Sequence, residues 1–161
     1  MRAVVTGGAK RLGKEIAIFL ATRGFEVAIH YHSSEKSADE LAQYIKSKTG
    51  NNCVSIKADL TQEIEVQDLI GRANDKLGGS ISCLINNASI FEYDNIWTAS
   101  RDSWDRHIES NLRAPFVLTQ SFANQVSPSI RDEHGEPLSQ GSVINLIDQR
   151  VKKLTPEFTS Y

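Results

Sequence analysis

Five short apolar runs, separated by longer segments, constrain the fold of this chain most strongly. Each run is bounded by Gly, Asn, Asp or Ser, and none alternates cleanly enough to face water on one side. They predict buried strands at Ala3–Val5, Glu26–Ile29, Val54–Ile56, Ile81–Ile85 and Val143–Ile147. Buried strands that alternate with helices are typical of a parallel sheet with helices on both of its faces.

The segments between the runs have the periodicity of amphipathic helices. Three helices are predicted from apolar faces that each end at glycine, namely Leu12, Ile16, Phe19 and Leu20 before Gly24, Ala38, Leu41, Ala42 and Ile45 before Gly50, and Val66, Leu69, Ile70, Ala73 and Leu77 before Gly78. A longer helical stretch is expected from Arg101 to Val126 with a break near Asn111, followed by a polar loop to Gly141. The 161 residues suffice for one ordinary domain. We therefore expect residues 1–161 to form one α/β domain with a doubly wound parallel sheet and helices on both faces.

The first predicted strand runs directly into a glycine-rich turn at the start of a helix, Thr6-Gly7-Gly8-Ala9-Lys10-Arg11-Leu12-Gly13. Glycines at such a turn let the backbone approach a pyrophosphate, whose charge is stabilised by the helix N-terminus. A glycine-rich turn alone is a weak signal, but its place between the first strand and the first helix favours phosphate binding. The predicted phosphate-binding residues are Gly7, Lys10, Arg11, Leu12 and Gly13.

This turn resembles the TGxxxGxG motif of the short-chain dehydrogenase/reductase family, with Arg11 in place of the middle glycine. Two later segments resemble the same family, Ala58-Asp59-Leu60 its adenine-contacting segment and Asn86-Asn87-Ala88-Ser89 its NNAG motif. Asn-rich turns also occur as plain structure, but motifs in this order at strand ends indicate a ligand site. The resemblance covers essentially the whole chain, and it implies cofactor contacts by Asp59, Leu60, Asn87, Ala88 and Ser89. It also implies that residues 1–161 form a single dinucleotide-binding domain with a Rossmann-like fold, which we expect to be incomplete at its C-terminus.

The residues after the second predicted strand favour NADP(H) over NAD(H). NAD-binding sheets place an acidic residue there, which accepts hydrogen bonds from the adenosine ribose. This chain has His32, Ser33 and Ser34 at that place, with no carboxylate among them. Together with Arg11, they offer the donors and the positive charge that a 2′-phosphate needs. Taken singly, Ser33 and the preceding His30 are equally consistent with solvated loop residues.

The family's catalytic set comprises a tyrosine, a lysine shortly after it, a serine before it and an asparagine in the long helix. Tyr161 matches the tyrosine and Asn111 the asparagine, whereas Asp148 stands where the serine is expected. This aspartate, Arg11 and Phe91 after the NNAG-like motif resemble the pteridine reductases and the related bacterial dihydromonapterin reductases. The resemblance implies that Phe91 stacks on a pterin. An ordinary packed aromatic and a helix-capping carboxylate remain the alternatives for Phe91 and Asp148.

The implied reaction is reduction of a C=N bond of an oxidised or dihydro pterin by NADPH. Tyr161 would supply the proton to nitrogen as general acid, and Asp148 would orient or reprotonate it. A carboxylate can also accept hydrogen bonds from pterin ring N–H and amino groups. The family's lysine, which would lower the pKa of the tyrosine, does not occur before the sequence stops at Tyr161. We therefore expect the 161-residue polypeptide by itself to be poorly active.

Two other functions are consistent with the same residues. A reductase of small carbonyl compounds would share the motif variants and turn over ketones in place of pterins. A non-catalytic NADP(H)-binding module would bind the nucleotide without hydride transfer, and the missing lysine favours it.

Composition and charge exclude some classes of partner. A formal net charge of −2, with 24% charged residues, gives no electrostatic case for nucleic acid or an anionic membrane. No apolar run approaches the length of a membrane span, and the N-terminal run is too short for a signal peptide, so we expect a cytoplasmic location. Cys53 and Cys83 lie in apolar runs without a CxxC neighbour or nearby histidines, which predicts core thiols and no metal site.

Two expectations concern assembly. The last predicted strand would be left as an exposed apolar edge, which is an association hazard. Family members pair through the long helix, so the resemblance implies that the intact protein forms homo-oligomers and acts on a small-molecule substrate.

Overall fold

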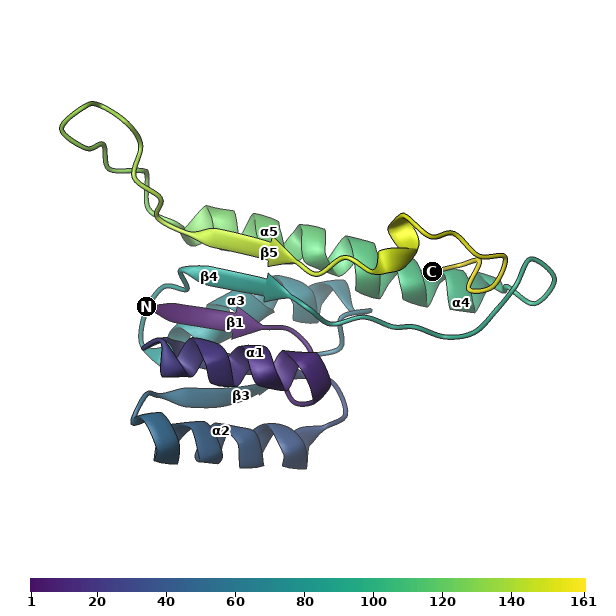
Figure 1. The fold of residues 1–161 in the computed structure, drawn as a ribbon, viewed down its shortest axis with the longest axis horizontal. Coiled ribbons are helices and arrows are strands. Elements are labelled where there is room, and N and C mark those ends of the chain that lie inside the picture. The colour runs from purple at the N-terminus through teal and green to yellow at the C-terminus, as the bar shows by residue number, and fades with distance from the viewer.

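Strands and helices alternate along the computed structural model, which describes residues 1–161 (Figure 1). The strands are β1 (Arg2–Val5), β2 (Glu26–Tyr31), β3 (Cys53–Lys57), β4 (Cys83–Asn86) and β5 (Ser142–Asn145). The helices are α1 (Arg11–Thr22), α2 (Glu35–Thr49), α3 (Glu63–Leu77), α4 (Arg101–Ile108) and α5 (Ala114–Gln125), with the π-helix η1 (Glu109–Arg113) and the 3₁₀ helix η2 (Gln149–Val151). The predicted alternation is confirmed.

All five strands belong to one parallel sheet, in the order β3-β2-β1-β4-β5. Val4 of β1 pairs with Ala28 of β2 on one side and with Leu84 of β4 on the other. The chain therefore winds outward from β1 to β3 and then crosses to the other side of β1. In such sheets a crevice opens at the carboxyl ends of the central strands, where ligands bind. The doubly wound, Rossmann-like fold is confirmed.

Two apolar cores cover the two faces of the sheet, because successive strand side chains point to opposite faces. Val4 and Ala28 belong to the core under α3 and α5, whereas Val5 and Ile29 belong to the core under α1 and α2. Figure 1 shows α1 in front of the strands and α3 behind them. This layering holds the carboxyl ends of the strands in place. The loops that follow these ends contain most of the residues of the candidate site.

The apolar face expected for α1 is only partly correct. The structure buries Gly13, Ala17 and Ala21, while Leu12 and Phe19 are each 57% exposed. The other two expected positions lie half-buried at the margin of the core. Small residues occupy the buried face because a helix that starts at a tight glycine turn packs closely on the strands beside it.

The break expected near Asn111 is a π-helical turn. The helix continues from α4 through η1 into α5, and Asn111 lies in the middle of η1. A π-turn inserts one extra residue into a helix, and such turns are frequent at functional sites. Pro115, which has no N–H to donate, lies just after this π-turn, where the regular α-helical hydrogen-bond pattern is already interrupted.

Two strand boundaries differ from expectation. β4 begins at Cys83 because the N–H of Ile81 bonds to side chains, Asn74 Oδ1 at 3.0 Å and Gln125 Oε1 at 3.2 Å, and not to a neighbouring strand. β5 ends at Asn145, short of the expected Ile147. The predicted polar loop between α5 and β5 is confirmed, and it contains only one isolated bridge, between Arg131 and Pro137.

β5 is an edge strand, as expected, and it exposes apolar side chains. Ile144 is 49% exposed, and Ile147, just beyond the strand, is 74% exposed. Cys53 and Cys83 are free and buried, as expected, and burial raises the pKa of the Cys53 thiol to about 12. None of the helices has the length and apolar character needed to cross a membrane. No group of three or more His, Cys, Asp or Glu side chains is placed to hold a metal ion.

Candidate functional site

The turn between β1 and α1 lies at the carboxyl edge of the sheet and contacts the turn that follows β4. Gly7 has a φ of +60°, a conformation that glycine adopts without steric cost. A Cβ on Gly7 would lie 3.1 Å from the Cα of Ala88, and a Cβ on Gly13 would lie 2.6 Å from Nδ2 of Asn87. The two glycines therefore allow a close approach of the two turns that no other residue permits.

Hydrogen bonds fasten these two turns together. Oγ1 of Thr6 accepts the N–H groups of Asn87 and Ala88, both at 2.9 Å, and donates to the carbonyl oxygen of Ile85 at 3.3 Å. Nδ2 of Asn87 donates to the carbonyl oxygens of Thr6 at 2.8 Å and Gly7 at 3.3 Å. The structure thus brings Gly7, Asn87 and Ala88, three of the predicted cofactor residues, into one assembly.

His30 supports the glycine turn by a hydrogen bond to its backbone, a role that the sequence analysis missed. It is no solvated loop residue, because only 2% of it is exposed. Its Nδ1 accepts the N–H of Gly7 at 3.0 Å, so its Nε2 carries the hydrogen and donates to the carbonyl oxygen of Ala58, also at 3.0 Å. Burial lowers the pKa of His30 to about 4, which keeps the imidazole neutral at pH 7. A histidine at the end of an otherwise apolar run indicates burial, but the run does not identify the partners of this histidine.

The N-terminus of α1 is open to an anion. The side chain of Lys10, at the N-cap, makes no capping hydrogen bond, and the first helical turn contains no acidic residue. Lys10, Arg11, Leu12 and Lys14 are all exposed, so three positive charges surround the helix start. The residues present therefore suit a pyrophosphate, whose negative charge the helix N-terminus and these side chains would stabilise.

The segment after β2 presents donors to solvent. His32 and Ser33 are exposed, Ser34 is half-buried, and neither serine hydroxyl is engaged in a hydrogen bond. Nε2 of His32 lies 3.7 Å from Oδ2 of Asp59. Burial acts to raise the pKa of the Asp59 carboxyl, but hydrogen bonds from the N–H and the hydroxyl of Thr61 outweigh it, and the pKa is lowered. This ionised carboxylate is therefore held by Thr61 beside His32.

Leu60 and Ser89 are less clearly directed towards a cofactor. Leu60 is only 8% exposed, and its side chain belongs to the apolar core under α3. Ser89 is exposed, and its hydroxyl donates to the carbonyl oxygen of Ile90 at 3.3 Å. Their cofactor contacts stay predictions.

Asn111, predicted as catalytic, holds the chain segment that follows β4. Its Oδ1 accepts the N–H of Ile90, and its Nδ2 donates to the carbonyl oxygen of the same residue, both at 2.8 Å. Both ends of the amide are therefore occupied by backbone. The structure gives Asn111 a direct hold on the residue next to Phe91, and its catalytic role stays a prediction.

Phe91 lies in an aromatic cluster with the residues near Tyr161. The ring of Phe158 is stacked on Phe91 at a centroid distance of 4.1 Å, and the ring of Tyr161 meets Phe91 edge-on at 4.9 Å. The Arg150 guanidinium lies 4.5 Å from the Phe158 centroid and 5.4 Å from that of Phe91. Phe91 is still 49% exposed, so a planar ligand has access to part of it.

Asp148 and Tyr161 are not joined in the structure. Asp148 caps η2, its Oδ1 accepts the N–H of Arg150 at 2.7 Å, and it makes no hydrogen bond to Tyr161. The capping interpretation of Asp148 therefore describes its contacts, and its catalytic role stays a prediction. Tyr161 is half-buried and its hydroxyl is free of hydrogen bonds, so that the hydroxyl is available to a substrate.

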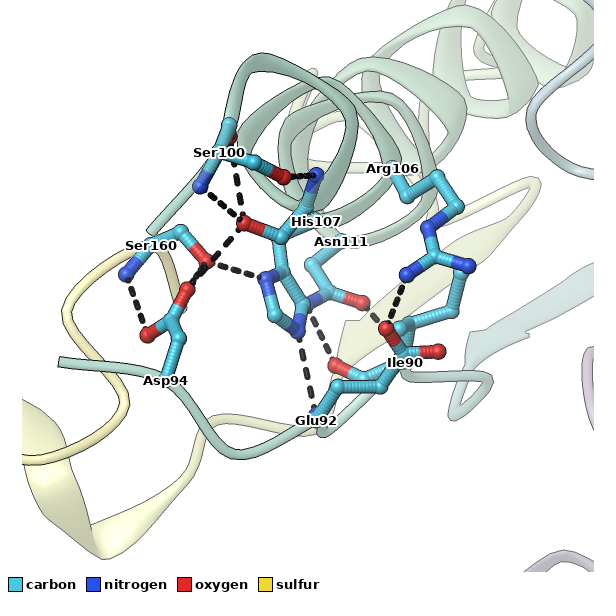
Figure 2. A network of polar contacts seen from close by, with 9 residues as sticks. Ile90, Glu92, Asp94, Ser100, Arg106, His107, Asn111 and Ser160 are labelled. Atoms are coloured by element: carbon cyan, nitrogen blue, oxygen red, sulfur yellow. Dashed lines mark hydrogen bonds and ion pairs between the residues drawn. The ribbon is translucent and has the colours of Figure 1, made fainter. Parts of the chain in front are cut away.

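A buried polar network beside Tyr161 was also missed by the sequence reasoning. Asp94, His107 and Ser160 are joined by hydrogen bonds and are 4%, 1% and 3% exposed (Figure 2). They lie far apart in the sequence, on the segment after β4, on α4 and next to Tyr161. No spacing rule could have connected them.

Comparison with known proteins places these features in context. The profile of the family described as "short chain dehydrogenase" matches residues 1–161. A short-chain type dehydrogenase/reductase of Picea abies is 28% identical over 99% of this chain, and the 3-oxoacyl-(acyl-carrier-protein) reductase FabG of Staphylococcus aureus is 30% identical over 90% of it. The chain spans 58% and 57% of the lengths of these two relatives.

Solved structures are similar over the same span. The crystal structure of FolM alternative dihydrofolate reductase 1 from Brucella suis, in complex with NADP, superposes with a TM-score of 0.86 at 38% sequence identity. The match covers 99% of this chain and 62% of that protein. Because the family profile extends over the whole chain, and the strand-end turns come together at one edge of a doubly wound sheet, this chain belongs to the short-chain dehydrogenase/reductase family.

Proposed function

We propose that this chain carries the NADP(H)-binding half and the acid tyrosine of a reductase that acts on a pterin-like C=N bond. The observation that carries the proposal is the contact between Phe91 and Tyr161, with ring centroids 4.9 Å apart. It places a ring that is 49% exposed, although Phe158 stacks on it, beside a free phenol, and a flat heteroaromatic substrate would use both groups. The similarity to FolM alternative dihydrofolate reductase 1, 38% identical, supports a substrate of this class.

The cofactor preference rests on charge. Arg11, Lys10 and Lys14 surround the start of α1, and the residues after β2 offer an imidazole and two hydroxyls without a carboxylate. A 2′-phosphate needs such donors, whereas a free ribose hydroxyl needs an acceptor at that place. Glu35, the first acidic residue after β2, already accepts a hydrogen bond from the hydroxyl of Tyr31 at 3.2 Å.

The chemistry divides between cofactor and protein. When bound, NADPH supplies the hydride that reduces the carbon of the C=N bond. Oη of Tyr161 donates a proton to the substrate nitrogen, because the resulting anion is too basic to leave unprotonated. The face of Phe91 orients the flat ring by stacking. Asp148 accepts hydrogen bonds from ring N–H or amino groups once the substrate is in place.

The test is a steady-state reductase assay of the complete gene product with NADPH and either a dihydropterin or a small ketone. Tyr161→Phe is expected to lower kcat by about 10²- to 10⁴-fold, the usual contribution of a general acid. The matched control is Tyr93→Phe, which keeps the ring contact with Phe158 and removes a hydroxyl that makes no hydrogen bond. Ketone turnover without pterin turnover would replace the substrate in this proposal. NADPH binding without any turnover would leave a non-catalytic binding module.

The carbonyl alternative has its own support in the comparisons. The Staphylococcus aureus relative is named as a 3-oxoacyl reductase and is 30% identical to this chain. The two substrates make different demands on Asp148, because a carbonyl oxygen needs a hydrogen-bond donor, whereas an ionised carboxylate only accepts. We therefore expect Asp148→Ser to lower the turnover of a pterin, whereas the turnover of a ketone should be unchanged or higher.

A further inference from the structure

One face of the α4–η1 helix matches the extended segment after β4, contact by contact (Figure 2). On this face the contacts are made by every fourth helical residue, and in the extended segment by every second residue. Ser103 lies opposite Asp94, His107 opposite Glu92, and Asn111 opposite Ile90. Four helical residues rise about 6 Å, and two extended residues span about 6.5 Å. The two elements therefore stay in register over three successive contacts while they run in opposite directions.

Each contact in this register is a hydrogen bond. Asn111 holds both backbone groups of Ile90 at 2.8 Å, and Nε2 of His107 accepts the N–H of Glu92 at 3.1 Å. The hydroxyl of Ser103 donates to Oδ2 of Asp94 at 3.2 Å. Residues 90–94 are therefore held at three points against a helix.

The middle contact fixes the direction of a second chain of hydrogen bonds. Because Nε2 of His107 is an acceptor, Nδ1 carries the hydrogen, and it lies 2.7 Å from Oγ of Ser160. The Ser160 hydroxyl accepts this hydrogen and donates its own to Oδ2 of Asp94. The N–H of Ser160 donates to Oδ1 of the same carboxylate at 3.2 Å. The hydrogen bond from the Ser160 hydroxyl lowers the pKa of Asp94, so the carboxylate stays ionised.

This network connects Phe91 and Tyr161, the two residues whose relative positions matter for the proposed reaction. Phe91 lies between Ile90 and Glu92, both of which are fixed to the helix, and Tyr161 directly follows Ser160. The Tyr161 ring also meets the His107 ring edge-on at 5.9 Å. We propose that His107, Ser160 and Asp94 are positioning residues, which hold the Tyr161 hydroxyl at a fixed distance from the substrate-binding face of Phe91. This inference rests on the proposed reductase function.

Truncation of any member breaks the network in a defined way. Ser160→Ala leaves the N–H of His107 without its partner and removes one of the two hydroxyl hydrogen bonds to Oδ2 of Asp94, and buried groups that lose such partners recruit water or shift. His107→Leu removes both the acceptor for Glu92 and the donor for Ser160. His107→Asn keeps a donor near the position of Nδ1, and therefore should still reach Ser160. His134→Leu, in the exposed loop between α5 and β5, is the matched histidine control.

The test combines kinetics with NADPH binding in the complete gene product. Ser160→Ala and His107→Leu are expected to lower kcat about 10- to 100-fold, the effect of a misplaced reacting group. The Kd of NADPH should stay within about twofold of the parent value, because the glycine turn does not contact the network. His107→Asn is expected to recover most of the lost kcat, and His134→Leu to match the parent. Unchanged kcat in both truncated variants overturns the inference.

Amide hydrogen exchange of the segment that contains Ser160 provides a readout independent of turnover. In the parent this segment should be protected, because the N–H groups of Phe158 and Ser160 bond to Asp94. Faster exchange in Ser160→Ala, confined to residues 155–161, supports the inference. This readout does not depend on turnover, so it holds even if the protein reduces neither substrate and the proposed function is thereby contradicted. Parent-like exchange in that variant overturns the inference. A general loss of protection in all variants, His107→Asn included, assigns the network a purely structural role and overturns it as well.

Discussion

Arg11 meets two opposing demands at a single position. Its backbone has a φ of +54°, a conformation that costs a non-glycine residue about 1–2 kcal/mol. Glycine would remove that cost, and the family motif that this turn resembles has a glycine there. The arginine is explained if its guanidinium binds a group that glycine cannot bind, such as the 2′-phosphate.

Arg11→Gly should therefore separate stability from cofactor choice. We expect the free energy of unfolding to rise by up to about 1 kcal/mol, since the relief of strain exceeds the entropy cost of glycine. The Kd of NADPH should rise about tenfold or more, as for loss of a charge-assisted hydrogen bond, and that of NADH should hardly change. Urea unfolding and fluorescence titration measure these quantities. Lys48→Ala, which removes an exposed charge from the last turn of α2, is the control. Equal weakening of both cofactors would contradict the assignment.

His30 makes the glycine turn sensitive to acid. Its pKa is lowered from 6.5 to about 4, so between these pH values the unfolded chain binds a proton that the native chain does not. Stability therefore falls as the pH is lowered from 6.5 towards 4, by about 3 kcal/mol in total from this group.

We expect His30→Gln to be less stable than the parent at pH 7.5, because its hydrogen bonds to Gly7 and Ala58 are less well directed. The stability difference between parent and variant should shrink as the pH falls from 6.5 towards 4. Urea unfolding across this range checks both expectations, and His134→Gln, an exposed histidine, is the matched control. A pH-independent difference would show that His30 titrates normally.

At the scale of elements, the approach of α1 to the turn after β4 depends on one missing side chain. A Cβ at Gly13 would lie 2.6 Å from Nδ2 of Asn87 and closer still to the backbone of Gly7. Gly71, in the middle of α3, has open space where its Cβ would be. The two helical glycines therefore make a matched pair.

Gly13→Ala is expected to destabilise the protein by about 1–3 kcal/mol, since the two turns must move apart, and to weaken NADPH binding. Gly71→Ala should stabilise it by about 0.5–1 kcal/mol, because alanine is the better helix former, and leave binding unchanged. Thermal unfolding and fluorescence titration decide between these expectations. A tolerated alanine at Gly13 would mean that the turns are not rigidly joined.

The elements also show where sequence periodicity fails. The face of the α4–η1 helix that contacts residues 90–94 carries the polar residues Ser103, His107 and Asn111. A hydropathy pattern predicts that such a polar face is exposed to solvent, yet His107 is 1% exposed. In α1 the large apolar residues Leu12 and Phe19 lie outside, and Ala17 and Ala21 lie inside. Periodicity locates a helix, but packing distance decides which side is buried.

At the scale of the whole molecule, the edge of the sheet at β5 exposes a run of apolar side chains. Ile144 lies in this strand and is 49% exposed, and Leu146 and Ile147 continue the exposed run. An unprotected edge pairs readily with other chains. Homo-oligomer formation by the intact protein stays a prediction.

We expect the 161-residue polypeptide to self-associate through this edge, and Ile144→Lys to reduce the association because a charged edge residue disfavours pairing. Ile64→Lys is the control, since Ile64 is 75% exposed at the start of α3, away from β5. Sedimentation velocity over a range of concentrations measures the effect. Equal effects of the two substitutions would assign the association to general hydrophobicity rather than to the edge.

The sequence by itself determined the order of strands and helices, the parallel sheet and the glycine turn, because these follow from local periodicity and from φ angles that few residues adopt. Tertiary structure alone decided the roles of His30, His107 and Ser160. Each of them is polar, and its role depends on a hydrogen-bond partner at least 15 residues away in sequence. Such partners meet only after the sheet has brought the strand ends together, so no pattern in the sequence carries their contact.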